Sequence, residues 1–208
     1  IPVGTFVKDD GQTSNEIVLG RYTFNTSDGT PHLEQAAYTT DNPDNYKNEV
    51  ELNHNSEIYK EVPQYRVGVA SDGADGLNAT ANNLKAFVES VKTNGGYYIA
   101  RYEASYASGT DIESYKAASK KSTAYSEDTM NYASGTLWND ITELEASKVS
   151  INTYNKENTT VKSDLMNSYA WDTAIVYIQE AGNANYANQT IVSIYFGKFY
   201  KNFSPFKI

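Results

Sequence analysis

The sequence predicts a single α+β domain in which a mixed, largely antiparallel sheet packs against two main helices. Two segments, residues 81–93 and 163–181, place apolar side chains at helical spacing. Short runs rich in strand-forming residues are bounded by turn residues; they lie at 3–7, 17–24, 62–70 and 97–104. A chain of 208 residues is long enough to bury a sizeable core, so we expect residues 1–208 to form one domain.

The first predicted helix, over residues 81–93, has one apolar face. Apolar side chains recur there at positions i, i+3, i+4 and i+7, namely Leu84, Phe87, Val88 and Val91. This spacing is typical of an amphipathic helix that packs against a sheet. Asn94, Gly95 and Gly96 follow, and residues that tolerate a positive φ commonly end a helix.

Residues 97–104 form the densest run of strand-forming residues in this part of the chain. Neither alternating face of the run is fully polar, which is typical of a strand that is covered on both sides. We therefore expect a central strand in which Arg101 and Glu103 pair with each other. A buried pair of this kind usually specifies structure rather than catalysis.

The second predicted helix, over residues 163–181, is apolar around more of its circumference. We expect Ser163 or Asp164 to cap its start and Gly182 to end it. Its apolar stripe consists of Met166, Ala170, Ala174, Tyr177 and Ile178, widened by Trp171 and Ile175. A helix of this sort belongs against a sheet or between layers. Together the two helices are expected to bury Phe87, Val91, Met166, Trp171 and Ala174.

Shorter elements and loops are predicted for the remaining chain. Residues 1–24 contain two strand-like runs around the polar stretch 9–15, which predicts a β-hairpin. Residues 25–61 are polar and acidic with little periodicity, so we expect a long surface excursion, either a functional loop or an insertion. Residues 71–78 are expected to be a loop, and residues 106–134 an exposed connection. Asn139 or Asp140 then caps a helical segment whose face is Ile141, Leu144, Ile151 and Tyr154.

Composition and charge exclude several classes of function. The net charge is −9 and basic residues do not cluster, so nucleic acid is not an expected partner. The chain has no cysteine, which excludes disulfides, thiolate nucleophiles and thiolate metal sites. No apolar run approaches the ~20 residues of a membrane span, so we expect no membrane insertion. Abundant Asn, Thr, Ser and Tyr suit a secreted or cell-surface protein.

Residues 1–6, IPVGTF, and residues 98–104, YIARYEA, are two of four motifs that carry a resemblance to a known family. They resemble the opening IPxGTF strand and the FYIxxYEV strand of the formylglycine-generating enzyme family, also called the sulfatase-modifying factor family, and all four motifs occur in the family's order. Trp138-Asn139-Asp140 is similar to the VSWxDA start of the next helix. Residues 163–174 stand where the family has LPTEAEWEYAA, with Trp171 and Asp172 over its Trp and acidic residue. The resemblance implies a variant of the C-type lectin fold.

Two departures change what this resemblance implies. The family's enzymes activate oxygen through copper held by cysteines, so no catalytic residue carries over and we expect no sulfatase maturation. The family's GNVWEW and RGGSW segments are absent, and residues 191–208 are aromatic, with three lysines and no acidic residue. This end is either a divergent final strand or an altered end that leaves the fold incomplete. Segments such as GGYYIARYEA also resemble exported or phage-encoded proteins of Gram-positive bacteria that are not known to be enzymes.

The sequence therefore favours a non-catalytic module, for which two interpretations remain. A recognition module would bind a glycan or a protein at a bacterial cell surface or on a phage particle, using tyrosine-bearing loops. Its candidate ligand-binding residues are Tyr106, Tyr115 and Tyr125, and its candidate loops are residues 106–134 and 25–61. A purely structural domain of a larger protein accounts for the same features.

An enzyme is the alternative from a different class. A hydrolase would use carboxylates or an imidazole, and the candidates are His32, His54, Asp9 with Asp10, and Glu49 with Glu51. None of them lies in a recognised catalytic motif, so no catalytic residue is assigned. No cofactor or metal ligand is assigned either. The DGADG stretch at residues 72–76 suggests calcium, but it lacks the ligand order of an EF-hand, and we prefer structural turns.

Overall fold

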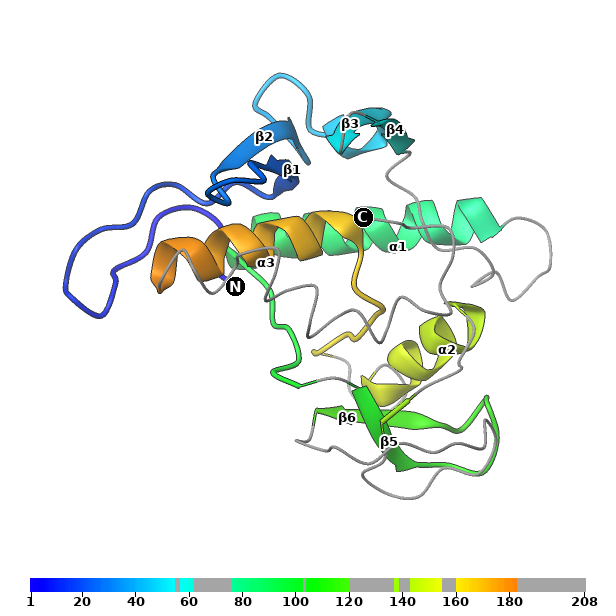
Figure 1. Cartoon of the computed structure of the whole chain (residues 1–208). Helices are drawn as coiled ribbons and strands as arrows, with labels where there is room; N and C mark the ends of the chain where they lie inside the picture. Colours follow the sequence, from blue (N-terminus) through cyan, green and yellow to red (C-terminus); the bar gives the residue numbers. More distant parts are fainter. Residues whose placement is uncertain are drawn as a thin grey trace.

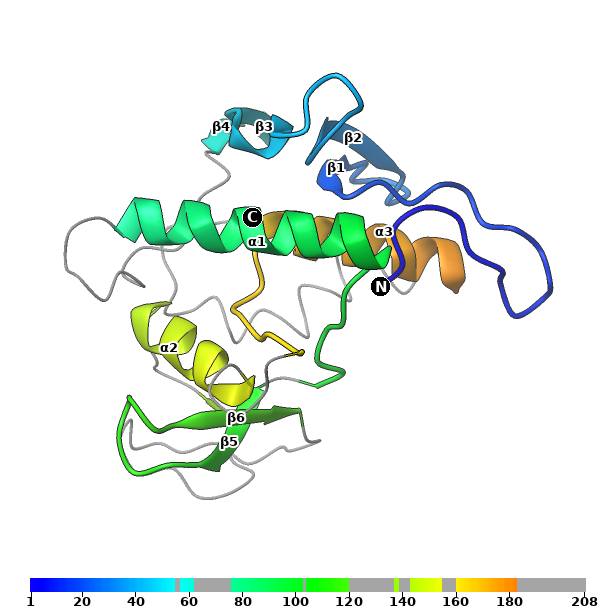
Figure 2. The same ribbon diagram turned by 180° about the vertical axis from the view of Figure 1, so that it is seen from behind.

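The computed structural model describes residues 1–54, 57–61, 76–102, 104–119, 137–138, 143–154 and 160–182. Within these residues the chain forms three α-helices and three two-stranded antiparallel sheets, so the α+β prediction is confirmed. The predicted single sheet is not formed by the described strands. In Figures 1 and 2, α1 and α3 cross the middle of the molecule, with β1 to β4 on one side and α2, β5 and β6 on the other.

In chain order the elements are β1 (Gly20–Phe24), β2 (Pro31–Ala36), the short 3-10 helix η1 (Asn45–Lys47), β3 (Val50–His54), β4 (Glu57–Glu61), α1 (Gly76–Asn94), β5 (Ala104–Ser108), β6 (Lys116–Ser119), α2 (Glu143–Tyr154) and α3 (Ser168–Ala181). The strands pair as β1 with β2, β3 with β4, and β5 with β6. The predicted strand at 62–70, Tyr125 and the aromatic stretch 191–208 lie outside the described residues.

Helix α1 confirms the first predicted helix and begins earlier than expected, at Gly76 rather than near residue 81. The low helix propensity of Asn is a small cost per residue, and the turn-like composition of residues 76–80 does not prevent a helix there. Its apolar face joins the main cluster of buried side chains, which we call the α1 cluster: Leu19, Ala37, Tyr46, Leu84, Val88, Val91 and Tyr169. Phe87 is half-buried beside this cluster and packs edge-to-face on Tyr97, with ring centroids 5.2 Å apart.

Two glycines follow α1, one required by its backbone conformation and the other by the close approach of a neighbouring segment. Gly95 has a φ of 70°, a left-handed conformation that glycine adopts without steric cost. A Cβ on Gly96 would lie 2.4 Å from the carbonyl oxygen of Ile1, because the N-terminal residues run alongside. Val3 N donates to Gly95 O at 2.9 Å, and Tyr97 N donates to Ile1 O at the same distance. The first residues of the chain are therefore paired to the end of α1.

The predicted central strand at 97–104 is wrong within the described residues, because the strand β5 begins only at Ala104. Strand-forming residues make a ladder only where a partner strand is present, and the N-terminal residues pair no further than Tyr97. Tyr98 is fully exposed, with a relative accessibility of 101%. Arg101 is also exposed and stacks over the ring of Tyr102, while Glu103 lies outside the described residues.

Helix α3 confirms the second predicted helix, but its start is later than expected. Asn167 is the cap: its side-chain oxygen accepts a hydrogen bond from Ala170 N at 3.0 Å. The predicted caps Ser163 and Asp164 lie outside the helix, and Met166, which precedes it, is 39% exposed rather than buried. The helix ends at Gly182 as predicted. Ala174 is buried as expected, and Trp171 is half-buried.

Residues 25–61, called the excursion below, are more regular than the sequence predicts. They contain β2, η1, β3 and β4, and β3 contacts both β1 and β2. Three buried apolar residues anchor this segment. Ala37 and Tyr46 belong to the α1 cluster, and Val50 is the first residue of β3. Their irregular spacing explains why periodicity did not reveal the structure. The N-terminal hairpin is present as two isolated bridges, Gly4 to Ile17 and Val7 to Thr13.

A second hydrophobic cluster lies on the other side of the helices. It consists of Tyr115, Trp138 and Val149, and we call it the Trp138 cluster. Helix α2 packs against β6 and contributes Val149, whereas Tyr154, expected on the buried face, is exposed. None of the helices in the described part of the chain has the length and apolar character of a membrane span.

We predict that Leu84→Ala lowers the free energy of unfolding by about 2–5 kcal/mol, because Leu84 is buried in the α1 cluster and the substitution leaves a cavity. The neighbouring exposed residue provides the control: Lys85→Ala should change stability by no more than about 0.5 kcal/mol. Urea unfolding followed by circular dichroism measures both. Equal stabilities for the two variants would contradict this assignment of the core.

Candidate functional site

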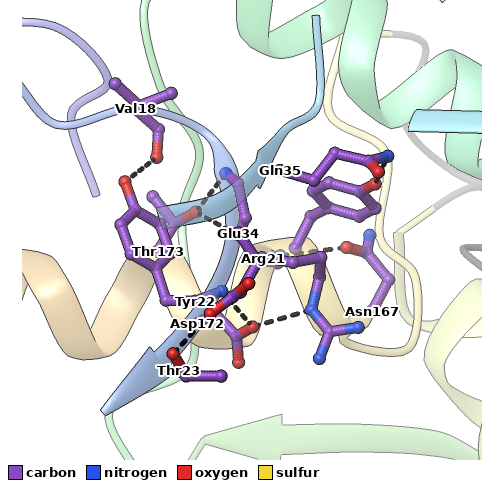
Figure 3. A network of polar contacts seen from close by, with 12 residues as sticks. Val18, Arg21, Tyr22, Thr23, Glu34, Gln35, Asn167, Asp172 and Thr173 are labelled. Carbon is purple, nitrogen blue, oxygen red and sulfur yellow. Dashed lines mark hydrogen bonds and ion pairs between the residues drawn. The ribbon is translucent and has the colours of Figure 1, made fainter. Parts of the chain in front are cut away.

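The most highly organised polar site among the described residues joins β1 to α3 (Figure 3). Arg21 Nε donates to Asp172 Oδ2 at 2.7 Å, and the backbone N–H of Tyr22 donates to the same oxygen at 2.9 Å. Arg21 is 5% exposed and Asp172 is 7% exposed. The guanidinium of Arg21 and a backbone amide thus both donate to one carboxylate oxygen, and both charged side chains are buried.

Burial raises the pKa of Asp172, while Arg21 and the Tyr22 N–H oppose the shift by stabilising the charged form. The carboxylate is enclosed by the strand that it binds, and one of its oxygens already accepts two hydrogen bonds. This geometry suits a group that docks β1 on α3 rather than one that reaches a substrate. Buried ion pairs of this kind are costly to break because the remaining charge loses its counter-charge.

Neutral hydroxyl and amide groups extend the site on both sides of the ion pair. Gly20 N donates to Thr173 Oγ1 at 3.1 Å, which fixes β1 to the next residue of α3. Gln35 Nε2 donates to Tyr169 OH at 2.9 Å and to Asn45 O at 2.7 Å, so one amide ties α3, β2 and η1 together. Burial raises the pKa of Tyr169 to about 12, and the phenol is therefore neutral at physiological pH.

The far end of α3 holds the N-terminal hairpin by a more exposed contact. Glu180 accepts from Lys8 Nζ at 2.7 Å and from Asn15 N and Nδ2 at 2.9 and 3.1 Å. The hydrogen bonds from Lys8 and Asn15 lower the pKa of Glu180. This contact depends on the charge of Glu180 and therefore on pH.

The predicted ligand-binding tyrosines do not form an exposed surface in the described residues. Tyr115 is 8% exposed and belongs to the Trp138 cluster, with its ring centroid 5.4 Å from that of Trp138. Tyr106 is half-buried, packs edge-to-face on both rings and donates to Gly109 O at 2.5 Å. Tyr125 lies outside the described residues. Ligand binding by these residues stays a prediction, and for Tyr115 a packing role is the one that the structure describes.

The candidate acids and bases of a hydrolase lie apart from the buried site. The side chain of His32 is 79% exposed and lies 4.0 Å from Glu34. Asp9 and Asp10 occupy an exposed turn, and Glu49 and Glu51 are also exposed. In the part of the chain that the structure describes, no three acidic or histidine side chains gather in a way that would hold a metal ion.

The excursion presents a different kind of surface from the buried network. Its anchoring residues are buried, whereas three consecutive residues of β2 are exposed: His32, Leu33 and Glu34. Ile58 on β4 is 59% exposed. The excursion thus exposes apolar as well as polar side chains, while its residues Ala37, Tyr46 and Val50 are buried.

Sequence analysis missed most of the buried network. Asp172 was singled out only by its resemblance to an acidic residue of the family, and Arg21, Thr173 and Gln35 were not singled out. The available signal was the position of Arg21 inside a strand-like run and of Asp172 within an apolar helix stripe. A charged residue at a core position implies a partner of opposite charge, but it does not say which one.

Comparison of the chain with protein-family models, with curated protein sequences and with solved structures finds no match.

We predict that Asp172→Asn lowers the free energy of unfolding by about 3–5 kcal/mol. The substitution keeps an acceptor for Tyr22 N but removes the charge that lies against Arg21. Adding Arg21→Met should recover part of this loss, because the double variant buries no unbalanced guanidinium. The control is Glu89→Gln on the exposed face of α1, where the ion pair with Lys92 contributes little to stability. A double-mutant cycle in urea measures the coupling, and strictly additive losses would contradict the ion-pair assignment.

We also predict a pH-dependent contribution from Glu180. Because its folded pKa lies below the ordinary value of 4.5, the contact stabilises the fold above that pH and is lost as the pH falls through the folded pKa. The melting temperature of Glu180→Gln should therefore lie below that of the wild type at neutral pH, and the difference should close as the pH falls below 4.5 and through the folded pKa. Thermal scans over this range provide the measurement. Glu16→Gln, an exposed control on the same hairpin, should keep the pH profile of the wild type, and a constant gap for Glu180→Gln would refute the prediction.

Proposed function

We propose that this chain is a non-catalytic recognition module on a C-type lectin-like scaffold, secreted or displayed at a bacterial cell surface or on a phage particle. Its ligand is a glycan or a protein, bound by the exposed side chains of the excursion. The observation that carries the proposal is the contrast within residues 25–61 between buried anchors, such as Tyr46 and Val50, and exposed residues, such as His32 and Ile58.

A binding surface gains affinity when its backbone is already ordered, since less conformational entropy is lost on binding. The excursion meets this condition. Tyr46 and Val50 are buried, and Gln35 joins the segment to Tyr169 of α3. Connecting segments on a rigid scaffold are also where proteins commonly place their binding residues.

The charge of this surface favours some ligands over others. Acidic residues outnumber lysines in the excursion, and the whole chain has a net charge of −9. Such a surface repels nucleic acid and anionic lipid, whereas it tolerates neutral glycans and basic or polar protein surfaces. Exposed Leu33 and Ile58 add apolar contact area of the kind that a sugar ring or a protein side chain covers.

The scaffold assignment rests on the order of the sequence motifs and agrees with two features of the structure. The IPVGTF segment is paired to the residues after α1, and Trp171-Asp172 lies on a helix that packs against the N-terminal sheet. The lack of cysteine removes the copper ligands of the family's enzymes, which supports a role in binding rather than in oxidation.

A glycan and cell-wall-fragment array, run with and without calcium, tests this function. We expect the wild type to bind at least one class of fragment, and the double variant His32→Ala with Ile58→Ser to bind at least tenfold more weakly. Both side chains are exposed, so the fold should be unaffected.

The matched control is Val7→Ser, which removes an exposed apolar side chain outside the excursion. It should bind like the wild type, and an equal loss in both variants would point to non-specific adhesion. Tyr125→Ala tests the other candidate stretch, because a loss confined to this variant would move the site to residues 106–134. Absence of binding by the wild type on glycan and protein arrays would instead favour a purely structural domain.

A further inference from the structure

Residues 38–43, called the Pro43 turn below, lie on the excursion between β2 and η1. The turn has hydrogen bonds of its own: Thr39 N donates to Asn42 O, and Asn42 N donates to Thr39 Oγ1, both at 3.0 Å. Its residues Thr39, Thr40 and Asp41 are exposed. Because both partners of each bond belong to the turn, these bonds give the turn its shape and do not fix its orientation on the helices.

The ammonium of Lys92, in the last turn of α1, has three partners. Lys92 Nζ donates to Pro43 O at 3.0 Å and to Glu89 Oε1 at 3.2 Å. It also lies 4.8 Å from the centroid of the Tyr38 ring. A lysine ammonium carries three N–H donors, and the face of a tyrosine ring attracts a cation. One charge on α1 therefore contacts both the first and the last residue of the Pro43 turn.

Partial burial strengthens the contacts of Lys92 with the turn. The side chain of Lys92 is 23% exposed, whereas that of Glu89 is 53% exposed. An ion pair with an exposed partner contributes little, because water screens it. A cation that is partly shielded from water interacts more strongly with a carbonyl oxygen and with an aromatic ring. We therefore expect the contacts with Pro43 and Tyr38, rather than the pair with Glu89, to carry most of the effect of this charge.

Another cation beside the turn, Lys47, is engaged with a near neighbour. Lys47 Nζ donates to Asp44 Oδ2 at 2.9 Å, and this hydrogen bond is the main cause of the lowered pKa of Asp44. The charges of Lys85 and Lys92 lower that pKa further. Lys85 is exposed on α1. Among the lysines that the structure describes, Lys92 is therefore the one whose ammonium is placed to hold the Pro43 turn on α1.

We propose that Lys92 is a positioning residue, whose ammonium fixes the orientation of the Pro43 turn on α1 and thereby presents residues 39–41 to a ligand. The presentation to a ligand rests on the proposed function of the excursion, whereas the positioning of the turn does not. Ala37 and Tyr46, on either side of the turn, are buried in the α1 cluster and keep the excursion anchored when the charge is removed. Loss of the charge therefore releases the turn and leaves the core intact.

Amide hydrogen exchange, measured by NMR on the full chain, tests the positioning. Lys92→Met keeps an unbranched apolar stem and removes the charge. We expect the amides of Thr39 and Asn42 to exchange at least about fivefold faster in this variant, because the turn opens locally. The amide of Tyr46, which donates to Ala37 O at 2.7 Å, should keep its wild-type rate. Lys92→Arg retains a cation that can contact a carbonyl and an aromatic face, so it should restore slow exchange.

The matched control is Lys85→Met, which removes an exposed cation from the same helix and should leave exchange in the turn unchanged. Wild-type exchange in Lys92→Met would overturn the proposal. Equal acceleration in Lys92→Met and Lys92→Arg would overturn it as well, because the effect would then come from side-chain shape rather than charge. Faster exchange of the Tyr46 amide together with the turn would assign Lys92 to general stability of the core and would also reject a positioning role.

Binding to the fragment that the array identifies provides the functional readout. We expect Lys92→Met to bind at least about threefold more weakly, because the released turn loses more conformational entropy on binding, and Lys92→Arg to bind like the wild type. Unchanged binding by Lys92→Met, with faster exchange in the turn, would show that residues 39–41 are not presented to this ligand. Absence of binding by the wild type would overturn the proposed function and the presentation together, while the exchange rates would still decide the positioning of the turn.

Discussion

One carboxylate oxygen determines how the N-terminal part of the chain sits on the helices. Asp172 Oδ2 receives both the guanidinium of Arg21 and the backbone N–H of Tyr22, so it fixes the side chain and the main chain of β1 together. Strand β2 pairs with β1, and β3 contacts both strands, which means that the position of the excursion follows from the same contact. The orientation of the excursion therefore depends on the carboxylate of Asp172, which binds β1 and not the excursion itself.

A second contact joins the two long helices. The ring of Tyr97 packs on Phe87 of α1, and its hydroxyl donates to the carbonyl of Ala170 on α3. Burial raises the pKa of this phenol, so the donor keeps its proton throughout the physiological range. In the Trp138 cluster the rings of Tyr115 and Trp138 pack with Val149 of α2, and Tyr106 of β5 and Ala117 of β6 lie against them. Lys148 of α2 also pairs with Glu113, which precedes β6.

The parts of the structure that the sequence predicts are those with a local cause. Helix α1 repeats apolar residues every turn, and Gly95 follows it in a left-handed conformation that glycine adopts without steric cost. The failures have non-local causes. Residues 98–102 lack a ladder partner among the described residues, and the excursion is ordered by anchors such as Tyr46 that follow no period. The buried site was harder to predict than the fold. Arg21 and its partner Asp172 are separated by most of the chain, and no local sequence pattern indicates that they pair.

The same separation has a consequence for how the protein is made. Arg21 and Asp172 are 151 positions apart, and ribosomes add about 5–20 residues per second. For roughly 8–30 s of translation, the nascent β1 and β2 therefore exist without the helix on which they dock. During that interval Ile17 and Leu19, both buried in the finished fold, are exposed to whatever surrounds the emerging chain. Their burial in clusters with Tyr169 and Val176 of α3 is completed only after that helix has been synthesised.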